Sequence, residues 1–326
     1  SKGLQHQFWQ TVKAGSDAAA AQYGVEITFE GPPSEADIQE QVKMLQNALS
    51  KKPAAIALAA LDTKAVLDQL QEAVRRKIPI VGFDSGVPNA PAGSIKANAS
   101  TDNYAAAGLA AEEMFAALKD KIEAATPAKP VTIVVMNQDA SGESLLSRGK
   151  GFRDKMVSLI SATKIGKAGI RVQGNPAYVA ADSPKDGKAV VIEMVVPASP
   201  RTQDATAAAK AVFAQVKQAN AIGMFCSNEG TVVGVLAATN DGADLATTYR
   251  GLVVIGYDAG KAQKDAVRKG LFLGSITQDP YQIGFKAVEL AYKAFKGEAV
   301  ANVDTGAKFY DKSNMDQKDI AILLYD

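Results

Sequence analysis

The sequence predicts an α/β protein with two doubly wound lobes, and three observations carry this prediction. The chain has 326 residues, which is more than one hydrophobic core usually serves. Continuous apolar runs at 131–136, 222–226 and 252–257 are typical of parallel strands that are buried on both faces. Finally, IPIVGFDSG at 78–86 and LVVIGYDAG at 252–260 end in the same way, which indicates that one structural unit occurs twice.

Helical patterns alternate with the apolar runs along the chain, as repeated β-α-β units require. The apolar residues of 38–49 recur with a period of 3.6. Ser34 and Asp37 precede them and favour a helix N-cap. A short strand is expected at 54–60 and a second helix over 67–74, directly before the first of the two repeated strands.

Each repeated strand end carries an aspartate, Asp84 in the first repeat and Asp258 in the second. In open α/β sheets, ligands bind beyond the carboxyl ends of the strands. If the two lobes face each other, these carboxylates lie on opposite walls of one cleft. An Asp before Gly also serves as a turn residue or a helix N-cap, and for either residue alone that interpretation is equally good. The repetition at equivalent strand ends favours a shared site.

Composition and charge exclude several classes of function. With 47% hydrophobic residues, 22% charged residues and a net charge of +1, nothing indicates a nucleic-acid partner or an anionic membrane surface. The single cysteine, Cys226, allows no internal disulfide, which fits the cytosol and equally an exported protein. No run reaches the roughly 18 apolar residues of a membrane helix, and no signal peptide is present. The abrupt start at Ser1 indicates a mature or trimmed chain with residues missing upstream.

Motifs for catalysis are missing from the sequence. His6 is the one histidine, so a catalytic triad would have to use it. No GxGxxG follows a strand, no GxxxxGKS/T occurs, and no pair of Cys or His residues has metal-ligand spacing. The carboxylates form no persuasive acid/base pair. We therefore expect a binding protein that is not an enzyme, with no catalytic residue, no metal and no cofactor.

The N-terminal stretch SKGLQHQFWQ brings aromatic residues to a predicted boundary between a strand and a helix. Phe8 and Trp9 are adjacent, so one of them can face the core while the other faces the cleft. The alternative is that both belong to the core. His6 lies at the same boundary, which is where a ligand would bind.

Three further polar residues lie at or just beyond predicted strand ends. Arg148 follows the strand at 131–136, Asn228 ends the strand at 222–226, and Gln278 precedes a strand-breaking proline. Arg148 could equally form a surface salt bridge, and Asn228 could cap a helix. Together with the aspartates and aromatic rings, this set suits a sugar. Hydroxyls both donate and accept hydrogen bonds, and the C–H face of a pyranose packs on an aromatic ring.

A set of motifs runs through nearly the whole chain. They are HQFW at 6–9, VGFDSG around Asp84, NASTDNYAAAG at 98–108, SRGKGF at 147–152, FCSNEGTVVGVL around Asn228, VIGYDAG around Asp258 and ITQDPYQIG around Gln278. Each motif alone is weak, but their order and spacing are highly specific. In this respect the chain resembles the ribose-binding-protein-like (type I) periplasmic sugar-binding proteins of ABC transporters.

The resemblance implies two lobes joined by a three-segment hinge. Residues 1–101 and 279–307 would form the N-terminal lobe, and residues 102–278 and 308–326 the C-terminal lobe. One monosaccharide, a hexose or a pentose, would lie in the cleft, and the lobes would close on it. The sugar-binding residues that the resemblance implies are His6, Phe8, Trp9, Asp84, Ser85, Arg148, Asn228, Asp258 and Gln278, with Lys2 as a weaker candidate.

The resemblance also implies a receptor that acts as a monomer and delivers its sugar to the membrane permease of an ABC transporter. No nucleic acid takes part. The expected location is the periplasm or the outside of the cell, with a lipid anchor as one option.

Some positions depart from the family pattern. Ser85 stands where ribose binders often carry Arg, which argues against ribose, and His6 replaces an amide. The stretch VVPASPRTQDA contains no aromatic residue although the pattern places one there, and its Arg201 is interpreted as structural. The segment 154–193 is longer than expected, which predicts an exposed hairpin or loop insertion.

The main alternative is the sugar-sensing effector domain of a LacI-type transcription regulator, which shares this fold. It would need a helix-turn-helix before Ser1, and none is visible. The tail KFYDKSNMDQKDIAILLYD does not have the character of a DNA-binding segment. A third class is an enzyme acting on a sugar or nucleotide, which would need an acid/base pair or a phosphate loop.

Overall fold

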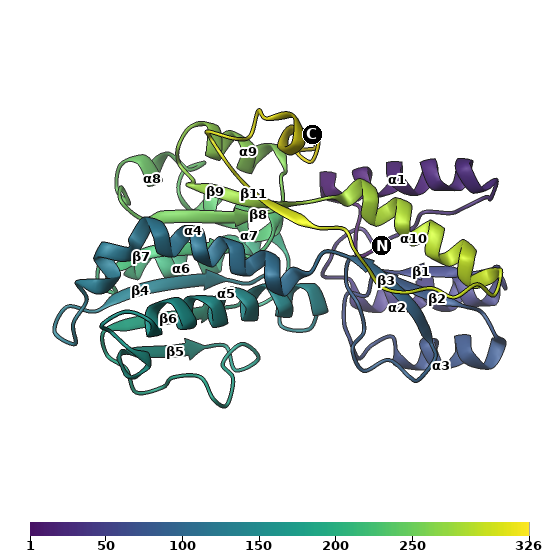
Figure 1. Cartoon of the computed structure of the whole chain (residues 1–326), viewed down its shortest axis with the longest axis horizontal. Coiled ribbons are helices and arrows are strands. Elements are labelled where there is room, and N and C mark those ends of the chain that lie inside the picture. The colour runs from purple at the N-terminus through teal and green to yellow at the C-terminus, as the bar shows by residue number, and fades with distance from the viewer. Residues whose placement is uncertain (326) are drawn as a thin grey trace.

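Two lobes lie end to end in the computed structural model, which describes residues 1–325 (Figure 1). Among these residues the strands form two separate sheets, one of four strands and one of seven. Helices cover both faces of each sheet (Figure 1). The predicted fold class, an α/β protein of two doubly wound lobes, is confirmed.

The first lobe contains the four-stranded sheet, in the order β1-β2-β3-β10, and its pairs are all parallel. Its strands are β1 (Ile56–Leu58), β2 (Ile80–Phe83), β3 (Ile95–Ser100) and β10 (Val303–Asp304). Its helices are α1 (Gln7–Tyr23), α2 (Ile38–Ser50), α3 (Leu67–Arg76) and α10 (Pro280–Phe295). The strand predicted at 54–60 is therefore shorter than expected, while the helices predicted at 38–49 and 67–74 are present.

The second lobe contains the seven-stranded sheet, in the order β11-β9-β8-β7-β4-β6-β5. Only the pair of β11 with β9 is antiparallel among these described strands. The strands are β4 (Val131–Met136), β5 (Ile170–Gly174), β6 (Val190–Val195), β7 (Ala221–Cys226), β8 (Val253–Tyr257), β9 (Gly274–Gln278) and β11 (Ala307–Asp311). The helices are α4 (Asn103–Glu123), α5 (Glu143–Ser161), the 3-10 helix η1 (Lys167–Gly169), α6 (Thr202–Gln215), α7 (Glu229–Ala238), α8 (Ala243–Ala246), α9 (Lys261–Arg268) and α11 (Lys318–Ala321).

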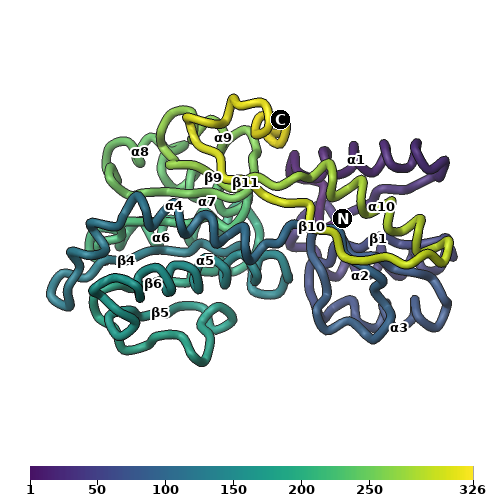
Figure 2. Tube along the Cα trace, viewed as in Figure 1, coloured from purple at the N-terminus to yellow at the C-terminus, as the bar shows by residue number. Residues whose placement is uncertain are grey.

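The chain passes between the lobes at three places within residues 1–325: after β3, before α10, and between β10 and β11 (Figure 2). The three segments lie side by side. The hydroxyl of Thr101 donates to the backbone oxygen of Gly306 at 3.3 Å, and Gln278 pairs with Ala307 at the start of β11. Short adjacent connections of this kind can act as a hinge, because small changes in a few backbone angles rotate a whole lobe.

The exposed loop predicted within 154–193 is present, since residues 175–188 form no helix or strand and are mostly exposed or half-buried, but one residue anchors it to the core. Tyr178 is fully buried in the core of the second lobe, and its hydroxyl donates to the backbone oxygen of Asp139. Arg153 donates to the backbone oxygen of Tyr178. A Cβ at Gly149 would lie 2.4 Å from the Tyr178 ring, so glycine there makes space for it. The insertion is held by this aromatic anchor and by β5, which extends the sheet beside β6.

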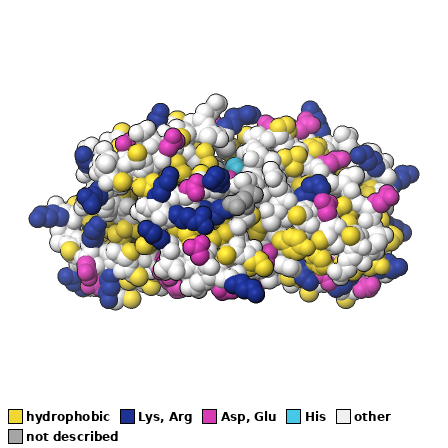
Figure 3. Space-filling view, turned by 90° about the horizontal axis from the view of Figure 1, so that it is seen from above, with side chains coloured by type: hydrophobic (Ala, Val, Ile, Leu, Met, Phe, Trp, Pro, Cys, Tyr) yellow, Lys and Arg dark blue, Asp and Glu magenta, His cyan; other side chains and the backbone are white. Residues whose placement is uncertain are grey.

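In the face drawn in Figure 3, basic and acidic side chains are interspersed over both lobes. Of the helices within residues 1–325, none combines the length and the apolar character needed to cross a membrane.

Helices α1 and α10 pack unusually close in the first lobe, because each carries a glycine at the contact. A Cβ at Gly15 would lie 1.9 Å from the backbone oxygen of Tyr281, and one at Gly284 would lie 1.9 Å from the backbone oxygen of Val12. The hydroxyl of Ser16 also donates to the backbone oxygen of Gly284 across this contact, at 3.3 Å. This contact holds α10, which follows a hinge segment, against the body of the first lobe.

Gly15→Ala should therefore lower the free energy of unfolding by about 1–3 kcal/mol, the usual cost of overpacking. Urea denaturation followed by circular dichroism measures this change. Gly108→Ala is the matched control in α4, since the nearest atom to its added Cβ is the flexible side chain of Lys155 at 3.6 Å. This control should be as stable as the wild type or slightly more so, because Ala is the better helix former. Equal stability of both variants would contradict the tight helix contact.

Candidate functional site

The repeated sequence motif builds the same turn at the end of one strand in each lobe. Asp84 follows β2 and Asp258 follows β8, and both have left-handed φ angles, of +57° and +82°. The N–H of Asp84 donates to the oxygen of Ala99 at 3.0 Å, and that of Asp258 to the oxygen of Ile276 at 2.6 Å. In each case the acceptor lies on the next strand. Aspartate tolerates this conformation better than most residues, so both aspartates serve as turn residues.

One cavity is lined by side chains from both lobes. The predicted site residues among its lining are Lys2, His6, Phe8, Trp9, Asp84, Arg148, Asn228, Asp258 and Gln278. It is also lined by Glu35, Leu145 and Glu229, which the sequence analysis did not identify. Ser85 is outside this set. Its hydroxyl accepts a hydrogen bond from the backbone N–H of Ser144 in the other lobe at 3.3 Å.

The first-lobe wall combines aromatic rings with a buried ion pair. Phe8 and Trp9 meet edge to face, with ring centroids 5.0 Å apart, and both side chains are buried. Nζ of Lys2 lies 3.1 Å from Oδ2 of Asp84. Burial alone would lower the pKa of Lys2, but the negative charges of Asp84 and Glu35 outweigh burial and raise it. Lys2 is therefore cationic in this wall.

Glu35 is the central acidic residue that sequence reasoning missed. Its Oε1 accepts from the indole N–H of Trp9 at 2.9 Å, and its Oε2 accepts from Nε2 of Gln138, in the second lobe, at 2.7 Å. Burial alone would raise the pKa of Glu35, but Lys2 and these hydrogen bonds lower it to about 2. In sequence, Glu35 is one acidic residue in a loop before a helix, and no local signal distinguishes it from a capping residue.

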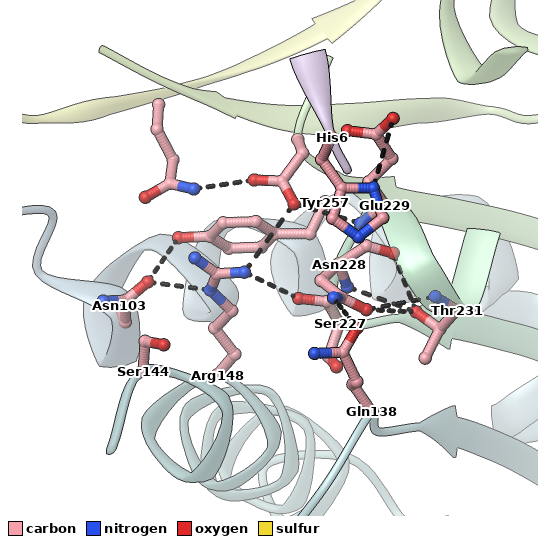
Figure 4. A network of polar contacts seen from close by, with 12 residues as sticks. His6, Asn103, Gln138, Ser144, Arg148, Ser227, Asn228, Glu229, Thr231 and Tyr257 are labelled. Atoms are coloured by element: carbon pink, nitrogen blue, oxygen red, sulfur yellow. Dashed lines mark hydrogen bonds and ion pairs between the residues drawn. The ribbon is translucent and has the colours of Figure 1, made fainter. Parts of the chain in front are cut away.

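The second-lobe wall is built around Arg148, which projects from α5 and is 3% exposed (Figure 4). Its guanidinium carbon lies 3.9 Å from the ring centroid of Tyr257. Nε donates to Oδ1 of Asn103 at 2.8 Å, and Nη1 donates to the backbone oxygen of Ser227 at 3.1 Å. These contacts hold the planar group in one orientation. The surface salt bridge considered as the alternative for Arg148 is thus excluded by its burial.

Asp258 lies at the meeting point of the other second-lobe residues. Its Oδ1 accepts from Nε2 of Gln278 at 2.6 Å and its Oδ2 from the backbone N–H of Glu229 at 3.0 Å, while Nη1 of Arg148 lies 3.8 Å from Oδ2. Burial raises the pKa of Asp258 against the opposing effects of Arg148 and Gln278. Asp258 thus presents a buried acceptor that is positioned by three neighbours.

Asn228 serves as the N-cap of α7, which is the alternative role that the sequence analysis gave for it. Its Oδ1 accepts from the backbone N–H of Thr231 at 3.0 Å. Its Nδ2 donates to Oε1 of Gln138, which links the cap to the Glu35 contact across the cleft. The same side chain therefore both caps the helix and lines the cavity.

The two lobes touch each other around the cavity. Nζ of Lys2 donates to the hydroxyl of Ser144 at 3.2 Å, and the backbone N–H of Lys261 donates to Oε1 of Gln7 at 3.1 Å. Near the rim, Nη2 of Arg201 lies 3.0 Å from Oδ1 of Asp37. The structural role expected of Arg201 is therefore an ion pair between the lobes. Together these contacts describe a closed arrangement.

The chemistry of the site is that of recognition by hydrogen bonds, charge and aromatic surface. Within the described part of the chain, no cluster of His, Cys, Asp or Glu is arranged to hold a metal ion. Cys226 is buried in the core, and burial raises the pKa of its thiol. A thiol of this kind is an unreactive packing residue.

Comparison with known proteins identifies the family. A family model described as a periplasmic binding protein domain matches residues 1–299. The chain belongs to the periplasmic binding protein family. The family predicted from the sequence is thereby confirmed.

Individual relatives of this periplasmic binding protein align over almost their whole length. The D-allose-binding periplasmic protein of Escherichia coli (strain K12) is 24% identical over 94% of this chain and 87% of its own. A Brachyspira murdochii structure, named as an ABC transporter, LacI family transcriptional regulator, is 38% identical with a TM-score of 0.80 and covers 99% and 96% of the two chains. An Agrobacterium vitis ABC transporter solute binding protein with bound D-fucose is 29% identical with a TM-score of 0.78 and covers 99% and 97%.

Glu35→Gln should lower the free energy of unfolding of this periplasmic binding protein at neutral pH, by roughly 3 kcal/mol if the whole pKa difference is realised. The folded-state pKa of Glu35 is depressed from 4.5 to about 2. Its contribution is therefore present above pH 4.5 and lost as the pH falls towards 2. Urea denaturation of both proteins at a series of pH values measures the difference.

The exposed Glu26→Gln variant is the control and should follow the wild type at every pH. If Glu35→Gln and the wild type lost stability in parallel on acidification, Glu35 would not be the stabilising carboxylate.

Proposed function

We propose that the protein is the solute-binding receptor of a sugar ABC transporter and that it holds one monosaccharide in the cavity between its lobes. The observation that carries this proposal is the cavity itself, which both lobes line with aromatic rings, carboxylates and buried cations. The family and the relatives support it. Their names include D-allose-binding and ribose import binding proteins and solute binding proteins with bound D-fucose or D-arabinose. Of the two functions weighed for this fold, these names favour transport.

Each wall would contribute a different part of sugar recognition. Phe8 and Trp9 supply apolar surface for the C–H face of the ring. Asp84 and Asp258 accept hydrogen bonds from hydroxyls, and Arg148 donates to ring or hydroxyl oxygens in a fixed geometry. His6, Asn228, Gln278 and Lys2 complete the set in this proposal, and Ser85 contributes through the interlobe contact instead.

We further propose that the lobes divide as the resemblance implies, with residues 1–101 and 279–307 against 102–278 and 308–326, with the difference that β11 of the second lobe already begins at Ala307. The adjacent crossing segments support this division. The proposed partner is the membrane permease, which receives the sugar from a monomeric receptor that performs no reaction on it. The family supports the proposed periplasmic location. The proposal includes, as one option, a receptor that is attached by a lipid on the outside of the cell.

Titration calorimetry over a panel of neutral hexoses and pentoses tests the function, and two variants test the site. Arg148→Gln and Asp258→Asn should each weaken binding of the tightest sugar by roughly tenfold to a hundredfold, because a hydrogen bond to a charged group contributes about 1.5–3 kcal/mol. Arg75→Gln, at an exposed ion pair on α3, is the control and should bind like the wild type. A wild type that binds no sugar of the panel would sink the proposed function. Wild-type affinity in both folded variants would remove these residues from the site.

Small-angle X-ray scattering tests the closure of the lobes. Asp84 and Asp258 belong to different lobes, so one sugar can bind both only when the cleft is closed. The radius of gyration should therefore decrease when the tightest sugar is added at saturation. An unchanged radius at saturation would count against hinge closure, while leaving binding itself intact.

A further inference from the structure

Glu229 begins α7 in the second lobe, next to two of the residues proposed to bind the sugar. It follows Asn228 directly, and its backbone N–H donates to Oδ2 of Asp258 at 3.0 Å. A Cβ at Gly260 would lie 2.6 Å from Oε1 of Glu229, so glycine there leaves room for the carboxylate. The backbone of Glu229 is thus fixed, and its side chain lines the cavity.

His6 faces Glu229 from the opposite lobe (Figure 4). Nδ1 of His6 lies 3.7 Å from Oε1 of Glu229, and both side chains are 15% exposed. The other ring nitrogen, Nε2, lies 3.0 Å from Nε2 of Gln5. Because His6 precedes α1 and Glu229 begins α7, this contact exists only while the lobes are together.

The second carboxylate oxygen of Glu229 has no hydrogen-bond donor among residues 1–325. Among the described residues, its Oε2 is a buried atom with no hydrogen-bond partner, and Oε1 of Gln278 on the same wall is in the same condition. A buried acceptor without a donor costs free energy. A carboxylate can only accept, so the missing partner is a hydrogen-bond donor, such as a sugar hydroxyl.

We propose that Glu229 is a further sugar-binding residue, which accepts a hydroxyl hydrogen of the sugar through Oε2 while His6 holds Oε1 across the cleft. This inference rests on the proposed sugar-binding function. The second lobe then offers the sugar two adjacent carboxylates, Asp258 and Glu229. Glu229 is held in its binding position only in the closed form, because His6 contacts it from the opposite lobe.

The contact between His6 and Glu229 also couples binding to pH. Burial alone would lower the pKa of His6, but the nearby carboxylate of Glu229 and the charges of Glu35 and Asp258 raise it. The cations that line the same cavity are Lys2 and Arg148. When the lobes open, Glu229 moves away and the pKa of His6 returns towards its ordinary value, so closure takes up a proton. Affinity is therefore at its full value below about pH 6.5 and falls as the pH rises through the raised pKa.

The test is calorimetry of the whole chain with the tightest sugar of the panel, at about pH 5.5 and about pH 8.5. The wild type should lose affinity at the higher pH, by about tenfold for each unit by which closure raises the pKa of His6. Glu229→Gln should bind about tenfold more weakly at the lower pH and show little pH dependence. His6→Gln should also show little pH dependence, because no imidazole remains to take up a proton on closure.

Glu113→Gln, at an exposed carboxylate of α4 in the same lobe, is the matched control and should reproduce the wild-type affinity at both pH values. Thermal melts show that each variant is folded. Wild-type affinity of folded Glu229→Gln at both pH values would overturn the inference, and so would a wild-type pH dependence in that variant. Either result leaves sugar binding established, whereas a wild type that binds no sugar overturns the proposed function together with this inference.

Discussion

Each permanently charged cation of the cleft has its main partner within its own lobe, and the ability of the lobes to separate depends on this arrangement. Lys2 pairs with Asp84 in the first lobe, and Arg148 lies beside Asp258 in the second. A buried ion pair that crossed the cleft would have to be broken at every opening, which would oppose separation of the lobes. The central contact that does cross it uses the neutral amide of Gln138. Opening therefore leaves Lys2 and Arg148 with their own partners, although it breaks the exposed ion pair of Arg201 with Asp37 and the contact of His6 with Glu229.

The backbone conformation of Asp84 and Asp258 fixes where their carboxylates lie in the cleft. Both occupy left-handed conformations, which cost free energy for residues other than glycine and recur at functional sites. The hydrogen bonds from their N–H groups to the adjacent strands, at Ala99 and Ile276, hold the turns in place. A carboxylate mounted on such a turn is positioned by the sheet rather than by a flexible loop. The two sheets thus bring equivalent groups to the cleft from opposite sides.

Local patterns explain why much of this was predictable from sequence. The period of the apolar residues and the repeated strand end predicted two doubly wound lobes and singled out Asp84 and Asp258. Glu35 was not predictable, because its partner Gln138 lies 103 positions away and only the folded chain brings them together. The burial of Tyr178 within the predicted exposed loop was not predictable for a related reason, since the space for its ring is made at Gly149, which lies far away in the sequence. The binding roles themselves stay predictions, since they depend on contacts with a sugar.

The contacts between the lobes are too weak to determine the closed state by themselves. The ion pair of Arg201 with Asp37 has side chains that are 50% and 28% exposed, and pairs of this kind contribute about 0–1 kcal/mol. The contact at Gln7 is a neutral hydrogen bond that contributes about 0.5–1.5 kcal/mol, and the one from cationic Lys2 to Ser144 contributes about 1.5–3 kcal/mol. Closure also orders the side chains that make them. A ligand shifts such an equilibrium by the difference between its affinities for the two states. One sugar would bind both walls only in the closed form, so its affinity for the closed form exceeds its affinity for the open form. This difference in binding free energy stabilises the closed form, which the contacts between the lobes do not do sufficiently by themselves.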